Sequence, residues 1–344
     1  SVHAAGLVIA PITLTDFSPL QREIKNPDKI MTQYEMHSLE DTGLVKMDLL
    51  GIRNLSILGE AVRIVKQEHN KDIDLNNLPT NDKKTYELLA RGETMGVFQL
   101  GSNGMIRYLK DLKPSNIFDI MAMVALFRPG PMASIPEFIQ RKHQPGKIKF
   151  FDPRMAEFLK ESYGVIVYQD DVLLTALHVA GYNWEEADKF RKAIGKKIPK
   201  EMAKQKEKFI EGAVKNGLTQ EKAEELFKLI EPFSGYGFNK AHAASYAQVA
   251  YQTAYIKAHY PVEYMTAMLT AESGNTDKVV AAIAECQRMN IKVLPPDINA
   301  SGIEFTIESG AVRFGLSAIK NVGAAAIEII FSARETGKFI SLAD

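Results

Sequence analysis

The sequence is 344 residues long, which exceeds one average domain and predicts two or three folded units. Its residues are 46% hydrophobic and 24% charged, a composition typical of soluble proteins with a packed core, and 42 basic residues balance 42 acidic ones. The zero net charge excludes a globally basic nucleic-acid-binding chain but leaves a local basic patch open, and the single cysteine, Cys286, excludes internal disulfides and cysteine-cluster zinc sites.

Neither end of the chain resembles a natural terminus. The first residue is Ser1, shortly before an apolar run, and the last is Asp344. We therefore expect both ends to be cut from a longer protein. No signal peptide opens the chain, and the longest apolar run, 120–127, is too short to cross a bilayer, so we expect a cytoplasmic protein with no membrane segment.

Residues 1–60 predict strands with short connections, and the chain as a whole an α+β fold. The apolar run 6–10 predicts a buried strand that ends at Pro11, and 44–50 is the clearest strand. A helix is predicted over 54–67, where apolar residues recur at helical spacing.

Residues 80–295 predict helices almost throughout. The segment Phe127-Arg128-Pro129-Gly130-Pro131 interrupts them, because no helix continues through two such prolines. The run 294–297 marks a boundary, and beyond it we expect a β-hairpin around Ser309-Gly310 and then a helix over 324–335. The helices expected before that boundary are 82–91, 103–112, 117–126, 155–162, 170–180, 183–194, 199–216, 219–233, 241–258, 261–272 and 276–290.

Two charged residues, Lys46 and Asp48, interrupt the apolar strand 44–50. Side chains in a strand alternate between faces, so these two share one face, whereas Val45 and Met47 are expected to point into a core. A carboxylate beside an ammonium group could hold a metal and a phosphate. The alternative is a surface ion pair, and one carboxylate is too few for a pair of divalent metals.

The segment 188–210 is a strongly basic part of the chain. It carries nine basic and three acidic residues, which gives +6 within a neutral chain. Arg191, Lys192, Lys196 and Lys197 gather at a turn between two expected helices, a corner that suits a triphosphate or a nucleic-acid backbone. The alternative is a solvated helix face without a ligand.

A glycine-rich loop over 234–243 opens a long expected helix. Glycine lets backbone approach a ligand, and helix N-termini favour anions, although the glycine spacing is not that of a Walker A loop. Asn239, Lys240 and His242, with two aromatic neighbours, could hold phosphates and stack on a base. The alternative is a capping loop whose aromatics fill the core.

Residues 315–324 predict a short helix, a tight hairpin and a second helix. Such a motif presents backbone N–H groups to a phosphate independently of base sequence. The alternative is an ordinary helical hairpin.

Together these segments resemble one family, the bacterial replicative DNA polymerase III alpha subunits of the C-family type. The resemblance covers essentially the whole chain, and the motifs occur in family order. They are Ser1-Val2-His3-Ala4-Ala5-Gly6, Leu44-Val45-Lys46-Met47-Asp48-Leu49-Leu50-Gly51, Val97-Phe98-Gln99-Leu100, Ala125-Leu126-Phe127-Arg128-Pro129-Gly130-Pro131, Tyr163-Gly164-Val165-Ile166-Val167-Tyr168-Gln169, Arg191-Lys192-Ala193-Ile194-Gly195-Lys196-Lys197, Gly235-Tyr236-Gly237-Phe238-Asn239-Lys240-Ala241-His242 and Leu294-Pro295-Pro296-Asp297-Ile298-Asn299.

The resemblance implies a palm of the polymerase-beta nucleotidyltransferase type over 1–60, helical fingers over 61–295, and the start of a duplex- and clamp-binding region over 296–344. It implies that Asp48 is one of three aspartates that bind a Mg²⁺ pair, the other two lying in an Asp-x-Asp motif outside this sequence, and that Lys46 contacts a phosphate. The residues implied to hold the incoming nucleotide are Arg128, Arg191, Lys192, Lys196, Lys197, Asn239, Lys240 and His242, and those implied to bind DNA are Lys320 and Gly323.

A few positions depart from the family pattern. Gly101 stands where Glu is common, and Asp170 and Asp171 stand where Glu and Gln are common. Lys192 replaces a frequent Arg, which keeps the charge but loses the bidentate fork. Asn321 replaces a hairpin glycine, a tolerable change because Asn visits the left-handed backbone region.

The expected function is template-directed DNA synthesis in bacterial chromosome replication. The expected partners are primer–template DNA, deoxynucleoside triphosphates and, through parts outside this sequence, a sliding clamp and other replisome subunits. With one of three aspartates, the chain alone is expected to be inactive. Two alternatives stay open: a non-catalytic nucleic-acid-binding module, and a helical scaffold that does not bind nucleic acid.

Overall fold

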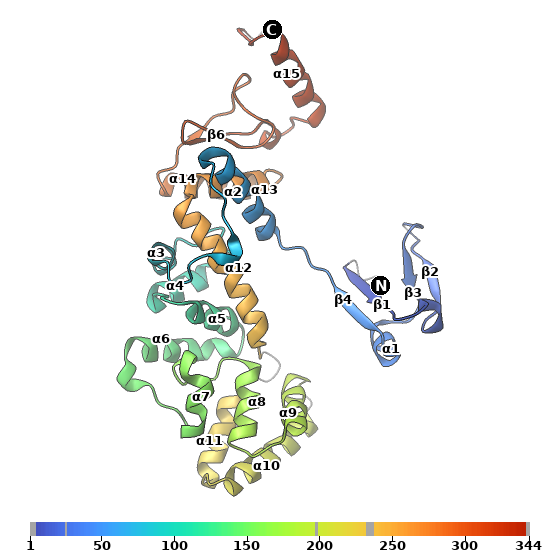
Figure 1. The fold of residues 1–344 in the computed structure, drawn as a ribbon, viewed down its shortest axis with the longest axis vertical. Helices are drawn as coiled ribbons and strands as arrows, with labels where there is room; N and C mark the ends of the chain where they lie inside the picture. The colour runs from blue at the N-terminus through green and yellow to red at the C-terminus, as the bar shows by residue number, and fades with distance from the viewer. Residues whose placement is uncertain (1–4, 25, 197–198, 232–236, 342–344) are drawn as a thin grey trace. The chain divides into compact units, whose positions relative to one another are not determined.

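A computed structural model describes residues 5–24, 26–196, 199–231 and 237–341 of the chain (Figure 1). The side chains of 195–201 are not described. The chain divides into two compact units, residues 1–53 and 54–344. Short strands in the first unit and predominantly helices in the second confirm the expected α+β class.

Two antiparallel ribbons form the first unit. β1 (Gly6–Ile9) pairs with β4 (Val45–Asp48), and β2 (Leu20–Arg22) pairs with β3 (Ile30–Thr32). A short helix, α1 (Met36–Asp41), begins where the Glu35 carboxylate accepts the backbone N–H groups of His37 and Ser38.

One face of the β1–β4 ribbon is apolar and exposed. The register pairs Leu7 with Met47 and Ile9 with Val45, and these side chains are 46–59% exposed. The expectation that Val45 and Met47 enter a core, and that 6–10 is a buried strand, is therefore wrong for this unit. Alternation in a strand decides which side chains share a face, but burial requires a further packing layer, and no described element of this unit covers that face.

The second unit is built around one long helix, α12 (Lys240–His259), which packs against α3, α5 and α13 (Figure 1). Alanines recur along it and let neighbouring helices approach closely; from Ala250 to Ala258 nearly every side chain is buried. The helices before the long helix are α2 (Arg53–His69), α3 (Lys83–Ala90), α4 (Asn103–Leu112), α5 (Ile117–Leu126), α6 (Ile135–His143), α7 (Ala156–Leu159), α8 (Gln169–His178), α9 (Trp184–Lys196), α10 (Pro199–Lys215) and α11 (Gln220–Ile230), and those after it are α13 (Pro261–Glu272) and α14 (Thr276–Arg288).

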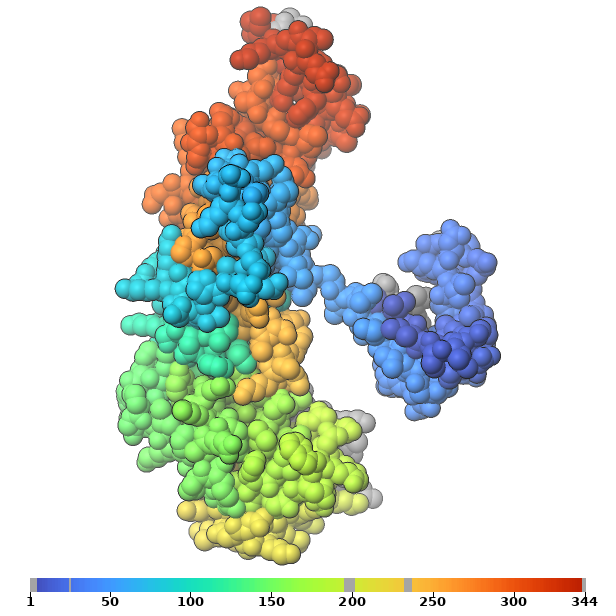
Figure 2. Space-filling view, viewed as in Figure 1, coloured from blue at the N-terminus to red at the C-terminus, as the bar shows by residue number. Residues whose placement is uncertain are grey.

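Two hydrophobic clusters stabilise this unit. The first joins α8 to α11 around the rings of Phe190, Phe209 and Phe227, each almost fully buried. The second joins α2, α13, α14 and the strands that follow, around residues such as Tyr264 and Val312. Figure 2 shows the atoms of α2, in light blue, against the orange atoms of residues far later in the chain.

A small sheet and a final helix complete the unit. The sheet order is β5 (Val293–Leu294), β7 (Ala311–Arg313), β6 (Thr306–Glu308), with β5 parallel and β6 antiparallel to the central strand. Ser309 and Gly310 both have positive φ, 52° and 76°, as a two-residue type I′ hairpin requires. A 3₁₀ turn (Leu316–Ala318) and α15 (Ala324–Thr336) follow.

Most expected helices are present within about two residues, but two expectations need correction. α6 is a helix that the sequence pattern does not predict, because Pro136 suggests a break; this proline lies in the first helical turn, where no N–H is needed. The helix expected over 155–162 is instead α7 flanked by the 3₁₀ turns Pro153–Met155 and Lys160–Ser162. Across the residues that the structure describes, no helix combines the length and apolar character needed to span a membrane.

Candidate nucleic-acid interface

In the first unit, Lys46 and Asp48 lie side by side at the end of β4. Their Nζ and Oδ1 atoms are 2.6 Å apart, and the side chains are 13% and 43% exposed. The predicted shared face is confirmed, because Lys46 pairs with Val8 and Asp48 with Gly6 across the ribbon. Among the described residues, no three His, Cys, Asp or Glu side chains are grouped as a metal site.

In the second unit, the 237–242 loop is fixed against the start of α8. Phe238 forms an isolated parallel bridge with Tyr168, and its carbonyl accepts the N–H of Gln169 at 3.0 Å. Asn239 caps α12 by accepting the N–H of His242 at 2.9 Å. The Asp170 carboxylate accepts the N–H of Lys240 at 2.9 Å, so the beginnings of two helices are joined.

Side chains from two segments lie close together at the start of α12, and we call them the Arg128 cluster: Arg128 from the first segment, and Phe238, Lys240, His242 and Tyr246 from the second. The guanidinium of Arg128 lies 4.3 Å from the Phe238 ring centre, and the His242 ring lies 5.1 Å from Phe238 and 4.1 Å from Tyr246. Lys240 lies 5.7 Å from the Tyr168 ring and 3.3 Å from Glu161.

The Arg128 cluster combines elements of both interpretations of this loop. Phe238 is buried and Asn239 is engaged in capping, as the structural alternative expects. However, His242 is exposed, and both Arg128 and Lys240 remain partly accessible. The Arg128 Nε is buried without a hydrogen-bond partner among the described residues.

A buried carboxylate, Asp171, fixes the start of α8. Its Oδ2 accepts the N–H groups of Val167 at 2.8 Å and Tyr168 at 2.9 Å. Burial raises the pKa of Asp171 to about 7, although these two hydrogen bonds favour the ionised form. The sequence pattern marks Asp170 and Asp171 only as departures from a family. Asp171 is the third residue of α8, and an acid at that position of a helix is a capping signal that could have identified it.

The basic corner is partly neutralised by its own acids. Arg191 and Lys192 both contact Asp188 at 2.7 Å, and their hydrogen bonds lower the pKa of that carboxyl. Lys189 is similarly paired with Glu185 at 2.6 Å. Such exposed pairs are weak and can exchange for a phosphate. Of the other two corner residues, Lys197 lies outside the described residues, as does the side chain of Lys196.

The fold relates this corner to the Arg128 cluster. α8 and α9 pack together and are joined by only five residues, 179–183, as in an antiparallel helical hairpin. The C-terminal part of α9, with Arg191 and Lys192, therefore lies at the same end of the pair as the start of α8. Phe238 and Lys240 are fixed at that same end.

The C-terminal motif is a helix–hairpin–helix, as predicted, with a 3₁₀ turn as its first helix. The Val322 N–H closes the hairpin on the Ile319 carbonyl at 3.1 Å, and Asn321 has a left-handed φ of 68°. Lys320 and Gly323 are exposed, and Gly323 provides no side-chain cap to α15.

Comparisons with known proteins agree with these features. The model of the bacterial DNA polymerase III alpha NTPase domain matches residues 1–51, that of the finger domain of the same subunit matches 54–217, and that of a helix-hairpin-helix motif matches 290–344. The NTPase-domain match, the finger-domain match and the helix-hairpin-helix match follow one another along the chain, and the first two are domains of the bacterial DNA polymerase III alpha subunit. The chain belongs to the DNA polymerase III alpha subunit family.

Curated relatives support this assignment over the whole chain. Three such relatives are named DNA polymerase III subunit alpha. The protein from Thermus aquaticus is 48% identical, and the match covers 100% of this chain and 28% of the relative. The protein from Escherichia coli K12 is 45% identical over 98% of this chain and 30% of the relative, and that from Bacillus subtilis 168 is 42% identical over 100% of this chain and 31% of the relative. The chain thus spans about three-tenths of the length of these relatives.

Proposed function

We propose that this chain supplies the end of the palm and the fingers of a DNA-directed DNA polymerase that copies a template during bacterial chromosome replication. The observation that carries the proposal is the Arg128 cluster, in which Arg128 and His242 lie against the buried Phe238 ring and Lys240 lies over the ring of Tyr168. Cations that remain accessible beside aromatic rings suit a nucleotide, which presents phosphates and a base together.

Within this proposal, each group of residues has a separate binding role. Arg128 and Lys240, with Arg191 and Lys192 across the α8–α9 end, hold the triphosphate of the incoming deoxynucleotide, as do Lys196 and Lys197. Asn239 orients His242 by capping α12, and His242 contacts the nucleotide. Lys320 and the backbone at Gly323 contact the phosphates of the DNA duplex.

Asp48 and Lys46 are the proposed contribution to catalysis. The described residues offer one carboxylate beside an ammonium group, so they do not by themselves form a site for two Mg²⁺ ions. We therefore assign Asp48 one ligand position, to be completed by aspartates outside this sequence, and Lys46 a phosphate contact. The chain alone should then give no primer extension.

The proposed partners are primer–template DNA and deoxynucleoside triphosphates, with a sliding clamp and other replisome subunits bound through other parts of the polymerase. A bacterial replisome subunit works in the cytoplasm, which is the proposed location.

Hydrogen exchange tests the proposal against a module that binds DNA only. Primer–template DNA with the nucleotide that matches the next template base should protect amides of 189–193 and 237–242 beyond the protection that DNA alone gives. Protection that is the same with and without nucleotide supports a non-catalytic DNA-binding module. A chain whose exchange does not respond to either ligand overturns both interpretations.

A further inference from the structure

The turn Val97-Phe98-Gln99-Leu100 holds one residue in a backbone conformation that its side chain disfavours. The Leu100 N–H closes the turn on the Val97 carbonyl at 3.2 Å, and Gln99 has φ of 62°. Glycine or asparagine is the ordinary occupant of such a position. Gln99 is exposed, and its side-chain amide makes no hydrogen bond among the described residues. Local packing therefore does not explain a glutamine here.

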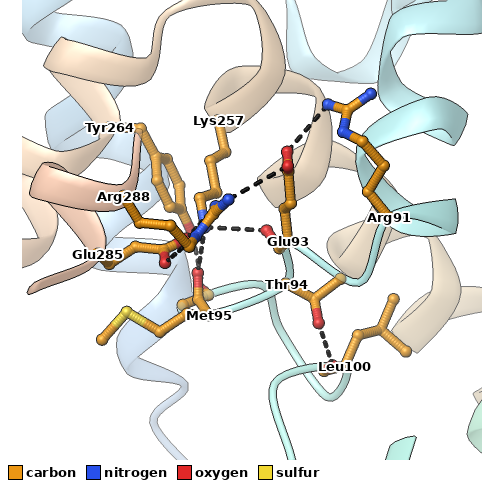
Figure 3. A network of polar contacts seen from close by, with 10 residues as sticks. Arg91, Glu93, Thr94, Met95, Leu100, Lys257, Tyr264, Glu285 and Arg288 are labelled. Carbon is orange, nitrogen blue, oxygen red and sulfur yellow. Dashed lines mark hydrogen bonds and ion pairs between the residues drawn. The ribbon is translucent and has the colours of Figure 1, made fainter. Parts of the chain in front are cut away.

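The segment that carries this turn is held by buried polar contacts (Figure 3). The fully buried Lys257 donates to the carbonyls of Glu93 at 2.9 Å and Met95 at 2.8 Å, and its charge is balanced by Glu285 at 2.6 Å. Thr94 holds the carbonyl of Leu100 at 2.6 Å. A buried ion pair contributes little net stability, but it fixes geometry.

Further contacts hold the centre of the segment. The carbonyl of Gly96 accepts from Asn54 at 2.9 Å and from Tyr264 at 2.8 Å, and the Phe98 N–H donates to Thr253 at 3.2 Å. Three separate helices, α2, α12 and α13, therefore fix the position of Gln99, while its side chain is exposed to solvent. Preorganised backbone that presents one uncommitted polar group is typical of a binding site.

The turn adjoins the Arg128 cluster. The ring of Phe98 lies 5.1 Å from that of Tyr246, which is part of the cluster. A little further on, Gly104 is so close to Phe127 that a β-carbon would lie 2.8 Å from the ring. The turn and the residues just after it thus contact both the residue before Arg128 and the aromatic stack beside it.

We propose that Gln99 contacts the edges of the bases at the nascent end of the primer–template duplex, next to the site that binds the incoming nucleotide. This inference rests on the proposed function and extends it, because it gives Gln99 a contact with base edges, separate from the phosphate contacts of the Arg128 cluster. A carboxamide both donates and accepts hydrogen bonds, which suits base edges.

The charge pattern favours base edges over phosphates at this surface. The exposed residues from Gln99 to Asn103 carry no charge, whereas the cations lie in the neighbouring cluster. A phosphate site would need cations, which neutralise the backbone and release counterions. A neutral amide can fix base position without changing the electrostatic part of binding.

The Gln99→Gly variant is the sharpest test, because it removes the amide while it suits the left-handed backbone. In the full chain it should melt no lower than the parent, yet bind primer–template DNA roughly five- to tenfold more weakly. The slope of log affinity against log salt should stay unchanged, since every phosphate remains bound as in the parent. Unchanged affinity overturns the inference, and a flatter slope assigns Gln99 to the phosphate backbone instead.

A cross-linking experiment locates the contact independently of affinity. Cys286 is fully buried, so a Gln99→Cys chain carries one accessible thiol. DNA with a thiol tether on a base edge at the primer terminus should form a disulfide with this chain. The matched control is Gln220→Cys, at an exposed site on α11, and it should not cross-link.

The outcomes separate the two proposals. The inference is supported if cross-linking at the terminal base pair exceeds cross-linking at internal duplex positions. If a chain that binds DNA normally cross-links equally at both positions or not at all, the inference about Gln99 is wrong, but the proposed function stands. A parent chain with no salt-dependent DNA affinity overturns the proposed function, and this inference with it.

Discussion

Lys257 shows how a single buried side chain can fix the backbone of a surface turn, here the segment that leads to Gln99. It has no exposed surface, and burial lowers its pKa although Glu285 opposes the shift. Hydrogen bonds from Arg288 and Lys257 outweigh the burial of Glu285 and lower its pKa to about 2. Lys257 and Glu285 both have hydrogen-bond partners within the protein (Figure 3).

Removal of this lysine should be strongly destabilising. Lys257→Met leaves two backbone carbonyls and part of a carboxylate unsatisfied, so we expect a loss of about 3–5 kcal/mol in the free energy of unfolding. Urea unfolding measures it. Lys278→Met is the control, since its pair with Glu272 is exposed on the lysine side and should contribute less than about 1 kcal/mol. Similar losses for the two variants would contradict the role given to Lys257.

Asp171 predicts a pH dependence of a defined sign. Its folded pKa, about 7, is raised above that of an unfolded carboxyl, so its favourable contribution is complete below about pH 4 and is lost as pH rises through 7. Asp171→Asn keeps an acceptor for the two N–H groups but never ionises. Its melting temperature relative to the parent should therefore rise between pH 5 and pH 8.5; a difference that is independent of pH would contradict this account.

At the scale of elements, two helical glycines allow the effect of packing on stability to be separated from the effect of helix propensity. In α10, a β-carbon on Gly212 would lie 2.3 Å from the carbonyl oxygen of Ala180, whereas Gly59 in α2 has nothing within 4 Å. Gly59→Ala should stabilise by about 0.5–1 kcal/mol, and Gly212→Ala should destabilise by more than that amount. Thermal melting of the two variants measures the difference. Stabilisation by both would show that α10 does not pack as described.

The helical part of the fold is predictable because its signals are local. The sequence pattern predicts helices over 103–112, 117–126 and 261–272 with the observed bounds, and side-chain caps such as Ser102 and Asn116 start the first two. The left-handed Asn321 is predictable for the same reason, since a tight hairpin needs that conformation. Strand β5 is not predictable in this way, because its pairing partner is β7, almost twenty residues later.

The candidate site is predictable in its residue types but not in its grouping. Sequence patterns identify Arg128, Lys240 and His242 separately, but a sequence does not show that Arg128 and His242 both lie against the Phe238 ring. Likewise, the charge count at the basic corner does not reveal that Arg191 and Lys192 share Asp188. Contacts between residues far apart depend on tertiary packing, which local pattern does not encode.

At the scale of the whole molecule, the chain is neutral, and the proposed function depends on where cations gather. The Arg128 cluster and the end of α9 concentrate four of them at one end of the α8–α9 pair. Elsewhere on the second unit, basic residues such as Lys83 and Lys278 pair with acids on their own or a neighbouring helix. A polyanion should therefore bind at one surface.

The salt dependence of primer–template binding tests this claim most directly. The test variant replaces four cations, Arg128, Lys240, Arg191 and Lys192, with Ala, and it should bind primer–template DNA weakly. Its slope of log affinity against log salt concentration should be flatter than that of the parent. The expected change is about 0.9 for each duplex phosphate that is no longer neutralised, or about 0.7 for each phosphate of single-stranded template. The control replaces four exposed lysines on other parts of the unit, Lys83, Lys228, Lys278 and Lys292, and should retain the slope of the parent. If the slope flattens equally in both quadruple variants, the cations act only through net charge, and the proposed interface is wrong.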